Sequence, residues 1–463
     1  MNDSAFSSSE FKTVPASFGQ ARLWFLDQLD PGRSDYNVGI GWRIAGEPDV
    51  AALRGALQYV VDRHEVLRTT FHAIDGEPWQ RIIPRREVAF ATTDLSNVPA
   101  SERETELARC VVKEIRTPFD LAKGPLSRAR LIRIAEGDHV LALVRHHATC
   151  GGDSGKITAR EAGAAYDALR AGRAPDLPPV VMQYADYVEW QRAHLTPERL
   201  EALTAYWRKR LSGAPAALML PLDRPRPAVR RTDGGCVSFH VDATLKAALN
   251  ALAENANVTL HMLLLAAFQV LLGRYADQDD VLVGSPVSAQ GSPEFKDVMG
   301  FLVNTVVHRG DLGGDPTFRK LLARTAASAR EAYRHRELSI ERVVEVAAPE
   351  REPGRDPLFQ AMFTLQEHES PPLSLAGLDC QPMRIRNTTA KAELSLLLYL
   401  ESGGLAGELE YSTELFHAAT IERMGIQFRT LLAEIVRDPD RPISRLPFIT
   451  EAERRTVVVE WNR

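Results

Sequence analysis

Two adjacent histidines, His146 and His147, are the side chains in this sequence best suited to acid–base chemistry. The ordinary pKa of an imidazole is about 6.5, so near neutral pH it can take a proton from an attacking nucleophile and pass it on. The apolar run Val140 to Val144 before the pair is typical of a buried strand. Because successive strand side chains point to opposite faces, we expect one histidine to pack and the other to face a cavity. Taken alone, such a pair is more often structural than catalytic.

Small residues follow the histidines and lead into a helix. The turn is formed by Ala148, Thr149, Cys150, Gly151, Gly152, Asp153 and Ser154. Apolar residues then recur at helical spacing, which predicts a helix over Gly155 to Arg170. The positive end of that helix dipole would stabilise a developing oxyanion near the turn, and an inward-pointing Asp153 would oppose it.

Cys150 permits two further kinds of chemistry next to His147. A thiol beside an imidazole can act as a nucleophile, and two histidines with a cysteine can bind zinc. The zinc hypothesis lacks a suitable ligand spacing and a fourth ligand, so we expect no metal and interpret Cys150 as a packing residue. The four cysteines are widely scattered, which favours a reduced cytoplasmic protein without disulfides. They are Cys110, Cys150, Cys236 and Cys380.

Length and composition exclude several classes of protein. A chain of 463 residues exceeds the limit of about 250–300 at which one core stops growing, so we expect two lobes. The proline-rich stretch Ala174 to Pro179 predicts a boundary between an N-terminal lobe, 1–175, and a C-terminal lobe, 176–463. With 56 basic and 61 acidic residues, the chain lacks the basic excess of a nucleic-acid-binding protein. Met262 to Leu272, one of the longest apolar runs, is too short to span a bilayer, and the N-terminus lacks a secretory signal, so we expect no membrane association.

Helix and strand patterns alternate along the chain, which predicts an α/β fold. Leu126 to Ile134 and Val140 to Val144 are joined by a turn and form a hairpin that delivers the histidines. Ser17 and Gln20 form a capping box that opens a helix over Ala21 to Leu29. Further strands are predicted at Tyr36 to Ile44, Leu67 to Phe71, Cys236 to Val241 and Val281 to Val283, and further helices at Leu245 to Leu252 and from Thr259 to Tyr275.

Several separated stretches resemble the condensation domains of nonribosomal peptide synthetases. Ser17 to Leu26 is similar to the family's SxAQxRLWxL, with Gly19 in place of the usual Ala, and Arg63 to Phe71 matches RHExLRTxF. The segments Tyr184 to Trp190, Gly300 to Thr305 and Arg355 to Phe363 resemble YxDYAxW, GxFVNT and NPLFQVMF, and Leu405 to Phe416 and Glu451 to Arg463 resemble the family's tail before an adenylation domain. The resemblance runs in order from about Pro15 to the last residue.

The family's central motif, HHxxxDG, is present in altered form. His146, His147 and Gly152 match, whereas Gly151 stands at the Asp position. In the family this Asp is structural and pairs with an arginine, for which Arg63 and Arg68 are the candidates here. Asp153 is the candidate to take over that pairing from two positions along, since adjacent glycines let the loop bend. If no residue has taken over, a Gly151→Asp change is expected to restore a fixed loop.

The resemblance implies two chloramphenicol acetyltransferase-like lobes in a V-shaped pseudodimer, with mixed sheets flanked by helices and the active site between the lobes. It implies amide bond formation between a donor acyl or peptidyl thioester and an aminoacyl acceptor. Each substrate is held on the 4'-phosphopantetheine of a peptidyl carrier protein, with no permanently bound cofactor, and an adenylation domain is adjacent. We expect His147 to be catalytic, the turn from His146 through Ser154 to form the active-site loop, and Asn304 and Asp186 to be structural. We expect a monomer.

The reactivity of a thioester agrees with a site that has one catalytic histidine and no metal. A thioester is already activated, so the enzyme has to juxtapose amine and carbonyl and manage one proton. Two alternatives stay open. Gly151 favours a catalytically silent domain that recruits another protein, and a starter or ester-forming acyltransferase would keep the chemistry with other substrates. The intact His147 favours an enzyme.

Overall fold

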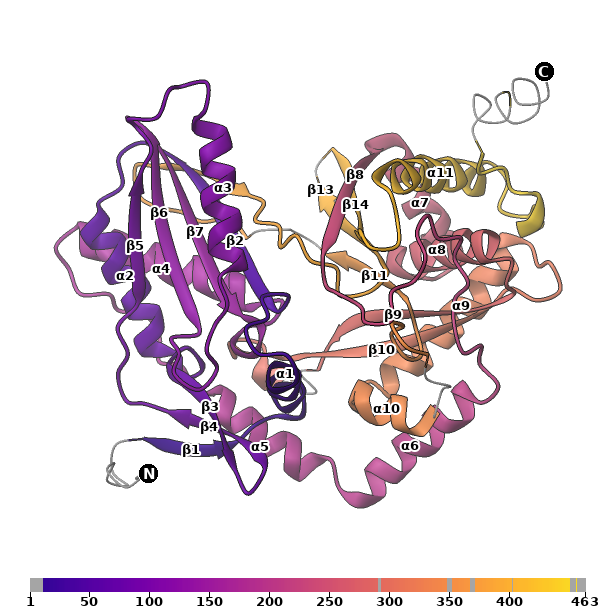
Figure 1. Ribbon diagram of the computed structural model, residues 1–463, viewed down its shortest axis with the longest axis horizontal. Helices are drawn as coiled ribbons and strands as arrows, with labels where there is room; N and C mark the ends of the chain where they lie inside the picture. Colours follow the sequence, from indigo (N-terminus) through magenta and orange to yellow (C-terminus); the bar gives the residue numbers. More distant parts are fainter. Residues whose placement is uncertain are drawn as a thin grey trace. The chain divides into compact units, whose positions relative to one another are not determined.

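The computed structural model describes residues 11–289, 293–347, 352–366, 371–401, 403–449 and 455 (Figure 1). The chain divides into two compact units. Unit 1 comprises Met1–Pro197, Ser288–Val303 and Glu369–Asn387, and unit 2 comprises Glu198–Val287, Asn304–His368 and Thr388–Arg463.

The division predicted after residue 175 does not coincide with this one. Unit 1 extends to Pro197 and takes in two later segments. The proline-rich stretch that suggested a connection is held on unit 1, because Arg63 Nη2 donates to the Pro178 carbonyl at 2.6 Å. Tyr184, farther along, is fully buried in the core of unit 1. Proline content therefore marked an irregular segment but not a boundary between units.

Unit 1 is built on a mixed sheet flanked by helices, as expected for an α/β fold. Among the described residues its main sheet has the order β12 (Asp379–Met383), β2 (Asn37–Ala45), β7 (Asp138–His146), β6 (Ser127–Ala135) and β5 (Ala89–Asp94). A smaller sheet of described residues has the order β1 (Lys12–Pro15), β4 (Glu77–Ile82) and β3 (Thr69–Ile74). The helices are α1 (Phe18–Leu29), α2 (Val50–Arg63), α3 (Arg103–Arg116), α4 (Ser154–Arg170) and α5 (Tyr184–His194), with short 3-10 turns η1 (Glu65–Arg68), η2 (His147–Thr149) and η3 (Pro293–Phe295).

The predicted hairpin that delivers the histidines is present. β6 and β7 pair antiparallel, with Ser127 opposite Arg145, while β5 runs parallel to β6. α3 lies against one face of this sheet, and α2 and α4 pack together on the other (Figure 1). Arg145 faces α4, because its Nη1 bonds Thr158 there, so His146 points to the opposite face.

Unit 2 also has a mixed sheet, covered by long helices. In the part that the structure describes, its strand order is β10 (Val303–Asp311), β9 (Asp280–Ser288), β11 (Ala361–Gln366), β13 (Leu394–Glu401), β14 (Gly404–Ser412) and β8 (Gly234–Asp242). The helices are α6 (Pro197–Leu211), α7 (Ala243–Asn255), α8 (Leu260–Ala276), α9 (Phe318–Arg334), α10 (Ile340–Ala347) and α11 (Ala418–Arg437), with a 3-10 turn η4 (Ile443–Arg445). The predicted cap Thr259 accepts a hydrogen bond from Met262 N and opens α8, which is apolar on nearly all sides and therefore central to the core.

Three further expectations meet different outcomes. The strand predicted from Leu67 begins at Thr69, because Glu65–Arg68 form a 3-10 turn first. Residues 290–292 lie outside the described residues, as does the family-like tail from Glu451 except Arg455. Among the described residues, no single helix is long and apolar enough to cross a membrane; α7 and α8 meet the length and composition test only as a pair bent by 104°.

Two histidines lie close together inside unit 2; His308 is buried and His261 is half-buried. His308 on β10 and His261 on α8 have ring centroids 6.3 Å apart, and His261 Nδ1 lies 3.1 Å from the Tyr333 hydroxyl. Burial lowers the pKa of His261 to about 4 and that of His308 to about 3, and the neighbouring His261 and Arg210 charges add to the effect on His308. Both rings are therefore neutral at pH 7. Within the described part of the chain, neither His308 nitrogen has a hydrogen-bond partner.

We predict that acid destabilises unit 2. Below an ordinary histidine pKa of about 6.5 the unfolded chain binds protons that the folded core excludes, so stability is complete above about pH 6.5 and falls as the pH drops toward 4. Each histidine contributes about 1–2 kcal/mol of this loss by pH 5. Denaturant unfolding at pH 7.5 and pH 5 should show a smaller difference for His308→Leu than for the parent. His240→Leu, at an exposed position on β8, is the control and should keep the parent's difference; equal differences in all three proteins would contradict the prediction.

Candidate active site

His147 follows the last residue of β7, and its imidazole makes a hydrogen bond to the loop and a contact with an aromatic ring. Its Nδ1 lies 2.8 Å from the carbonyl oxygen of Cys150, a geometry that assigns the proton to Nδ1. The Phe301 ring packs edge-on against the imidazole, with centroids 4.8 Å apart and planes at 82°. The side chain of His147 is partly exposed. An imidazole so held has Nε2 as its basic nitrogen and can accept a proton there.

His146 has a different environment, as the strand geometry predicts. It is buried at the last position of β7, opposite Asn37 of β2. Its Nδ1 accepts a hydrogen bond from Ala148 N at 3.3 Å, and its ring lies edge-on to Phe119 at 6.4 Å. His146 therefore shapes the turn from within the core.

The Ser17–Gln20 capping box also supports the histidine turn. Both reciprocal bonds of the box are present, as predicted. The buried Gln20 amide additionally donates to the carbonyl of Ala148 at 3.0 Å and to Gln80 at 3.2 Å. The local pattern identified the helix start, but this second role joins residues 128 positions apart, so it was missed.

Tyr184 joins three of the family-like motifs. Its hydroxyl donates to the Phe301 carbonyl at 2.9 Å and lies 2.8 Å from Ser17 Oγ. Burial raises the pKa of Tyr184 well above its ordinary value, so the hydroxyl stays protonated and can donate. A Cβ on Gly300 would lie 2.0 Å from Tyr184 Cδ2, so this segment needs glycine to approach the ring. The segment that carries Phe301 to His147 is thus anchored by Tyr184.

The two candidate arginines do not hold the histidine loop. Arg63 Nε lies 3.0 Å from Glu161 of α4, and His64 Nε2 lies 2.8 Å from the same carboxylate oxygen. Burial acts to raise the pKa of Glu161, but the hydrogen bonds and charges of His64 and Arg63 outweigh it and bring the pKa below its ordinary value. Arg68 donates to the carbonyls of Val61 at 3.2 Å and Pro84 at 3.1 Å.

Asp153 does not take over the pairing role, so that hypothesis is wrong. Its side chain is 49% exposed and its carboxylate lies 3.5 Å from Lys156 on the same helix. The physical reason is local: α4 begins at Ser154, which puts Asp153 at the N-cap with its side chain toward solvent and without a capping bond. Gly152 beside it is also exposed.

Gly151 is required by close packing. A Cβ at this position would lie 2.8 Å from the Gly300 carbonyl oxygen and 3.2 Å from Leu302 N. Both contacts are with backbone, which cannot move aside as a flexible side chain would. An Asp here would push the segment 300–302 away, so the expectation that Gly151→Asp restores the loop does not fit this geometry.

The remaining candidate residues, Asp186, Asn304 and Cys150, form hydrogen bonds to backbone atoms. Asp186 accepts from Gln183 N at 2.7 Å and caps α5. Asn304 of unit 2 donates to the carbonyls of Arg336 at 2.6 Å and Leu338 at 2.7 Å. Cys150 is buried, with Sγ 3.6 Å from the His146 carbonyl. Among the described residues, no three His, Cys, Asp or Glu side chains gather as metal ligands would.

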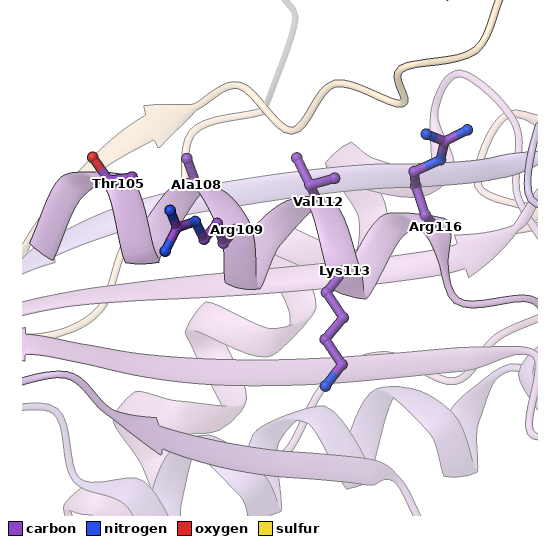
Figure 2. Close-up of a pocket in the computed structure, with 6 residues that line it drawn as sticks. All are labelled: Thr105, Ala108, Arg109, Val112, Lys113 and Arg116. Atoms are coloured by element: carbon purple, nitrogen blue, oxygen red, sulfur yellow. The ribbon is translucent and has the colours of Figure 1, made fainter. Parts of the chain in front are cut away.

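A groove of about 460 Å³ lies on α3, apart from these residues (Figure 2). It is lined by Thr105, Ala108, Arg109, Val112, Lys113 and Arg116. None of them belongs to a family-like motif, and the groove offers no acid–base group other than cations. This groove therefore does not include the histidine loop.

We predict that Gly151 tolerates no side chain whereas Gly152 does. Gly151→Ala should lower the free energy of unfolding by about 1–3 kcal/mol, because backbone must shift to admit the methyl group. Gly152→Ala is the matched control, since no atom lies within 4 Å of its Cβ position. Thermal unfolding of both variants beside the parent measures the difference. Equal midpoints for the two variants would contradict the close approach of Gly300.

We also predict that the carboxylates of Asp153 and Glu161 differ strongly in their effect. Asp153→Ala removes an exposed pair with Lys156 and should change stability by about 0–1 kcal/mol. Glu161→Ala leaves the buried His64 and the partly buried Arg63 without their carboxylate and should cost about 3–5 kcal/mol. Denaturant unfolding at pH 7 measures the free energy of unfolding of both variants. A loss of several kcal/mol for Asp153→Ala would show that Asp153 has a structural role after all.

Comparison with known proteins agrees with this arrangement. Residues 10–458 match the family model of the condensation domain. The chain is 44% identical over 451 residues to one of the subunits of the linear gramicidin synthase of Brevibacillus parabrevis, covering 97% of this chain and 9% of that protein. The X-domain from teicoplanin biosynthesis, solved in complex with OxyB, superposes with a TM-score of 0.84 at 28% identity, covering 97% and 98% of the two chains. The four-domain nonribosomal peptide synthetase AB3403 has the same fold, with a TM-score of 0.86 at 24% identity over 98% of this chain and 35% of that one.

The first of these relatives is far longer than the present chain, which spans about a tenth of it. Condensation domains of such synthetases transfer an acyl or peptidyl group from a thioester. Since the family model covers nearly the whole sequence, the chain belongs to the condensation-domain family of nonribosomal peptide synthetases.

Proposed function

We propose that this chain forms an amide bond between a carrier-bound acyl or peptidyl thioester and a carrier-bound aminoacyl group, and that His147 manages the proton of the attacking amine. The observation that carries this proposal is the orientation of His147. Its Nδ1 is engaged by the Cys150 carbonyl and its ring is braced by Phe301, so Nε2 is the nitrogen that can receive a proton.

The reaction needs little else from the protein. The amine nitrogen attacks the thioester carbonyl carbon, a carbon–nitrogen bond forms and the carbon–sulfur bond breaks. The proton lost by the amine goes to His147 Nε2 and then to the departing thiolate, which leaves as a thiol. Positioning of the two substrates supplies much of the rate enhancement, because the thioester is already activated.

The partners follow from the family and from the length of its members. Both substrates are held on phosphopantetheine arms of carrier proteins, with no permanently bound cofactor. We further propose that an adenylation domain is adjacent, that the domain acts as a monomer in the cytoplasm, and that neither nucleic acid nor a membrane is a partner. The residue-level roles of the histidine loop belong to the same proposal.

One observation favours a second candidate function, the recruitment of another protein. The teicoplanin X-domain, whose fold this chain shares, was solved in complex with OxyB. Gly151 at the motif's Asp position is the feature of this sequence that points the same way. Against it, the loop around Gly151 is closely packed and leaves His147 oriented for proton transfer.

We predict that His147→Ala lowers transfer by about 10²- to 10⁴-fold while the protein stays folded, because it removes the group that takes the amine proton. Cys150→Ala is the control; it removes a buried packing atom from the same loop and should change the rate only a few-fold. The measurement is single-turnover transfer from a loaded donor carrier to a loaded acceptor carrier of the same synthetase. A parent protein that transfers nothing between any loaded pair would leave recruitment as the function.

A further inference from the structure

We propose that Ser154 is a positioning residue for His147: its hydroxyl fixes the peptide group whose carbonyl sets the His147 tautomer. This inference rests on the proposed role of His147 in proton transfer. The partners of the Ser154 hydroxyl are backbone N–H groups and not the imidazole. Its effect passes through the peptide bond between Cys150 and Gly151.

The hydroxyl oxygen of Ser154 accepts hydrogen bonds from two backbone N–H groups near His147. The side chain is buried, at 2% exposure. Its Oγ accepts from Gly151 N at 2.9 Å and from Gly300 N at 3.3 Å. The two segments that enclose His147, the histidine turn and the Gly300 segment, are thus held by one oxygen atom.

The Cys150–Gly151 peptide carries this constraint to the imidazole. Its N–H donates to Ser154 and its C=O accepts from His147 Nδ1 at 2.8 Å. A peptide group is planar, with N–H and C=O pointing in opposite directions, so fixing one fixes the other. If this peptide rotates, the Nδ1–H group loses its acceptor, and the tautomer with Nε2 as the basic nitrogen loses its stabilisation.

Ser154 is held in turn by a short chain of hydrogen bonds to β7. The Ser154 carbonyl accepts from Thr158 Oγ1 at 2.7 Å, and Thr158 Oγ1 accepts from Arg145 Nη1 at 2.7 Å. The buried Arg145 also reaches Ser127 Oγ at 3.4 Å and Met299 Sδ at 3.8 Å. Arg145 immediately precedes His146 on β7, so the first turn of α4 is tied to the strand that delivers the histidines.

This network offers a physical account of the altered motif. No side chain fits at position 151 beside the Gly300 carbonyl, so a carboxylate there is not available to hold the loop. A neutral hydroxyl, Ser154, accepts the two N–H groups instead. Of the described residues, none places a carboxylate within ion-pair distance of Arg145, which binds hydroxyls and a sulfur atom.

The tautomer of His147 tests the proposal directly. The chain is labelled with ¹⁵N-histidine, and His147→Gln identifies the His147 signals among those of the 12 histidines. In the parent, long-range ¹H–¹⁵N spectra should show the Nδ1–H tautomer alone. Ser154→Ala should give a mixture of both tautomers, whereas an unchanged tautomer in folded Ser154→Ala protein would overturn the proposal.

A matched pair at Thr158 separates positioning from packing and covers the case in which Ser154→Ala does not fold. Thr158→Val keeps the shape but removes the hydroxyl that binds the Ser154 carbonyl, and Thr158→Ser keeps the hydroxyl but removes a methyl group. We expect Thr158→Val to shift the tautomer toward the mixture and Thr158→Ser to retain the parent's tautomer. The same tautomer in both variants would contradict a relay through Thr158 and Ser154.

Kinetics supply the second readout. In single-turnover transfer, Ser154→Ala should lower the maximal rate by about 10- to 10²-fold, less than removal of the imidazole itself, and should change the half-saturating concentration of loaded acceptor carrier only a few-fold. Loss of saturation without loss of maximal rate would assign Ser154 to binding. A parent without transfer would refute the proposed function, while the tautomer comparison would still decide the role of Ser154.

Discussion

The close approach of the Gly300–Val303 segment to the histidine loop is the constraint on which the site of unit 1 depends. The backbone of Gly300 and Leu302 lies so near Gly151 that no β-carbon fits between them. The same approach brings the Phe301 ring to His147 and the Gly300 N–H to Ser154. It is possible because position 151 is glycine, whereas the glycine at position 300 is needed for the close approach to the Tyr184 ring. This approach thus accounts for the absence of a side chain at position 151 and for the contacts of Phe301 with His147 and of Gly300 with Ser154.

A cluster of ionisable side chains in unit 1 is attached to α4, the helix that follows this loop. Arg63 and His64 belong to the RHExLRTxF stretch, yet their carboxylate partner, Glu161, lies on α4, the helix that begins at Ser154. Removing the shared carboxylate of Glu161 leaves Arg63 and His64 without it, which is costly in a low-dielectric interior. The loop itself is held by neutral partners such as Gln20. This division suits the proton transfer proposed for His147, which needs a defined imidazole tautomer rather than a strong local field.

Local patterns predicted much of the fold. The β6–β7 hairpin, the Ser17 capping box and the long helix after Thr259 all follow from turn residues, caps and apolar periodicity. The α/β class and the family were available from the same residues, because alternating elements and ordered motifs are properties of the chain alone. His147 stood out for the same reason: its chemistry belongs to the residue type and its place after a strand to the local sequence.

Tertiary structure decided which groups meet. The partner of Arg63, the second role of Gln20 and the absence of space at Gly151 depend on contacts between residues far apart in the chain. An arginine in an apolar strand, Arg145, was the one local signal of the network behind Ser154, but its partner Thr158 lies on the following helix. The sequence determines which side chains can hydrogen-bond, whereas the donors and acceptors that come within reach are set by how strands and helices pack, and no local pattern encodes those distances.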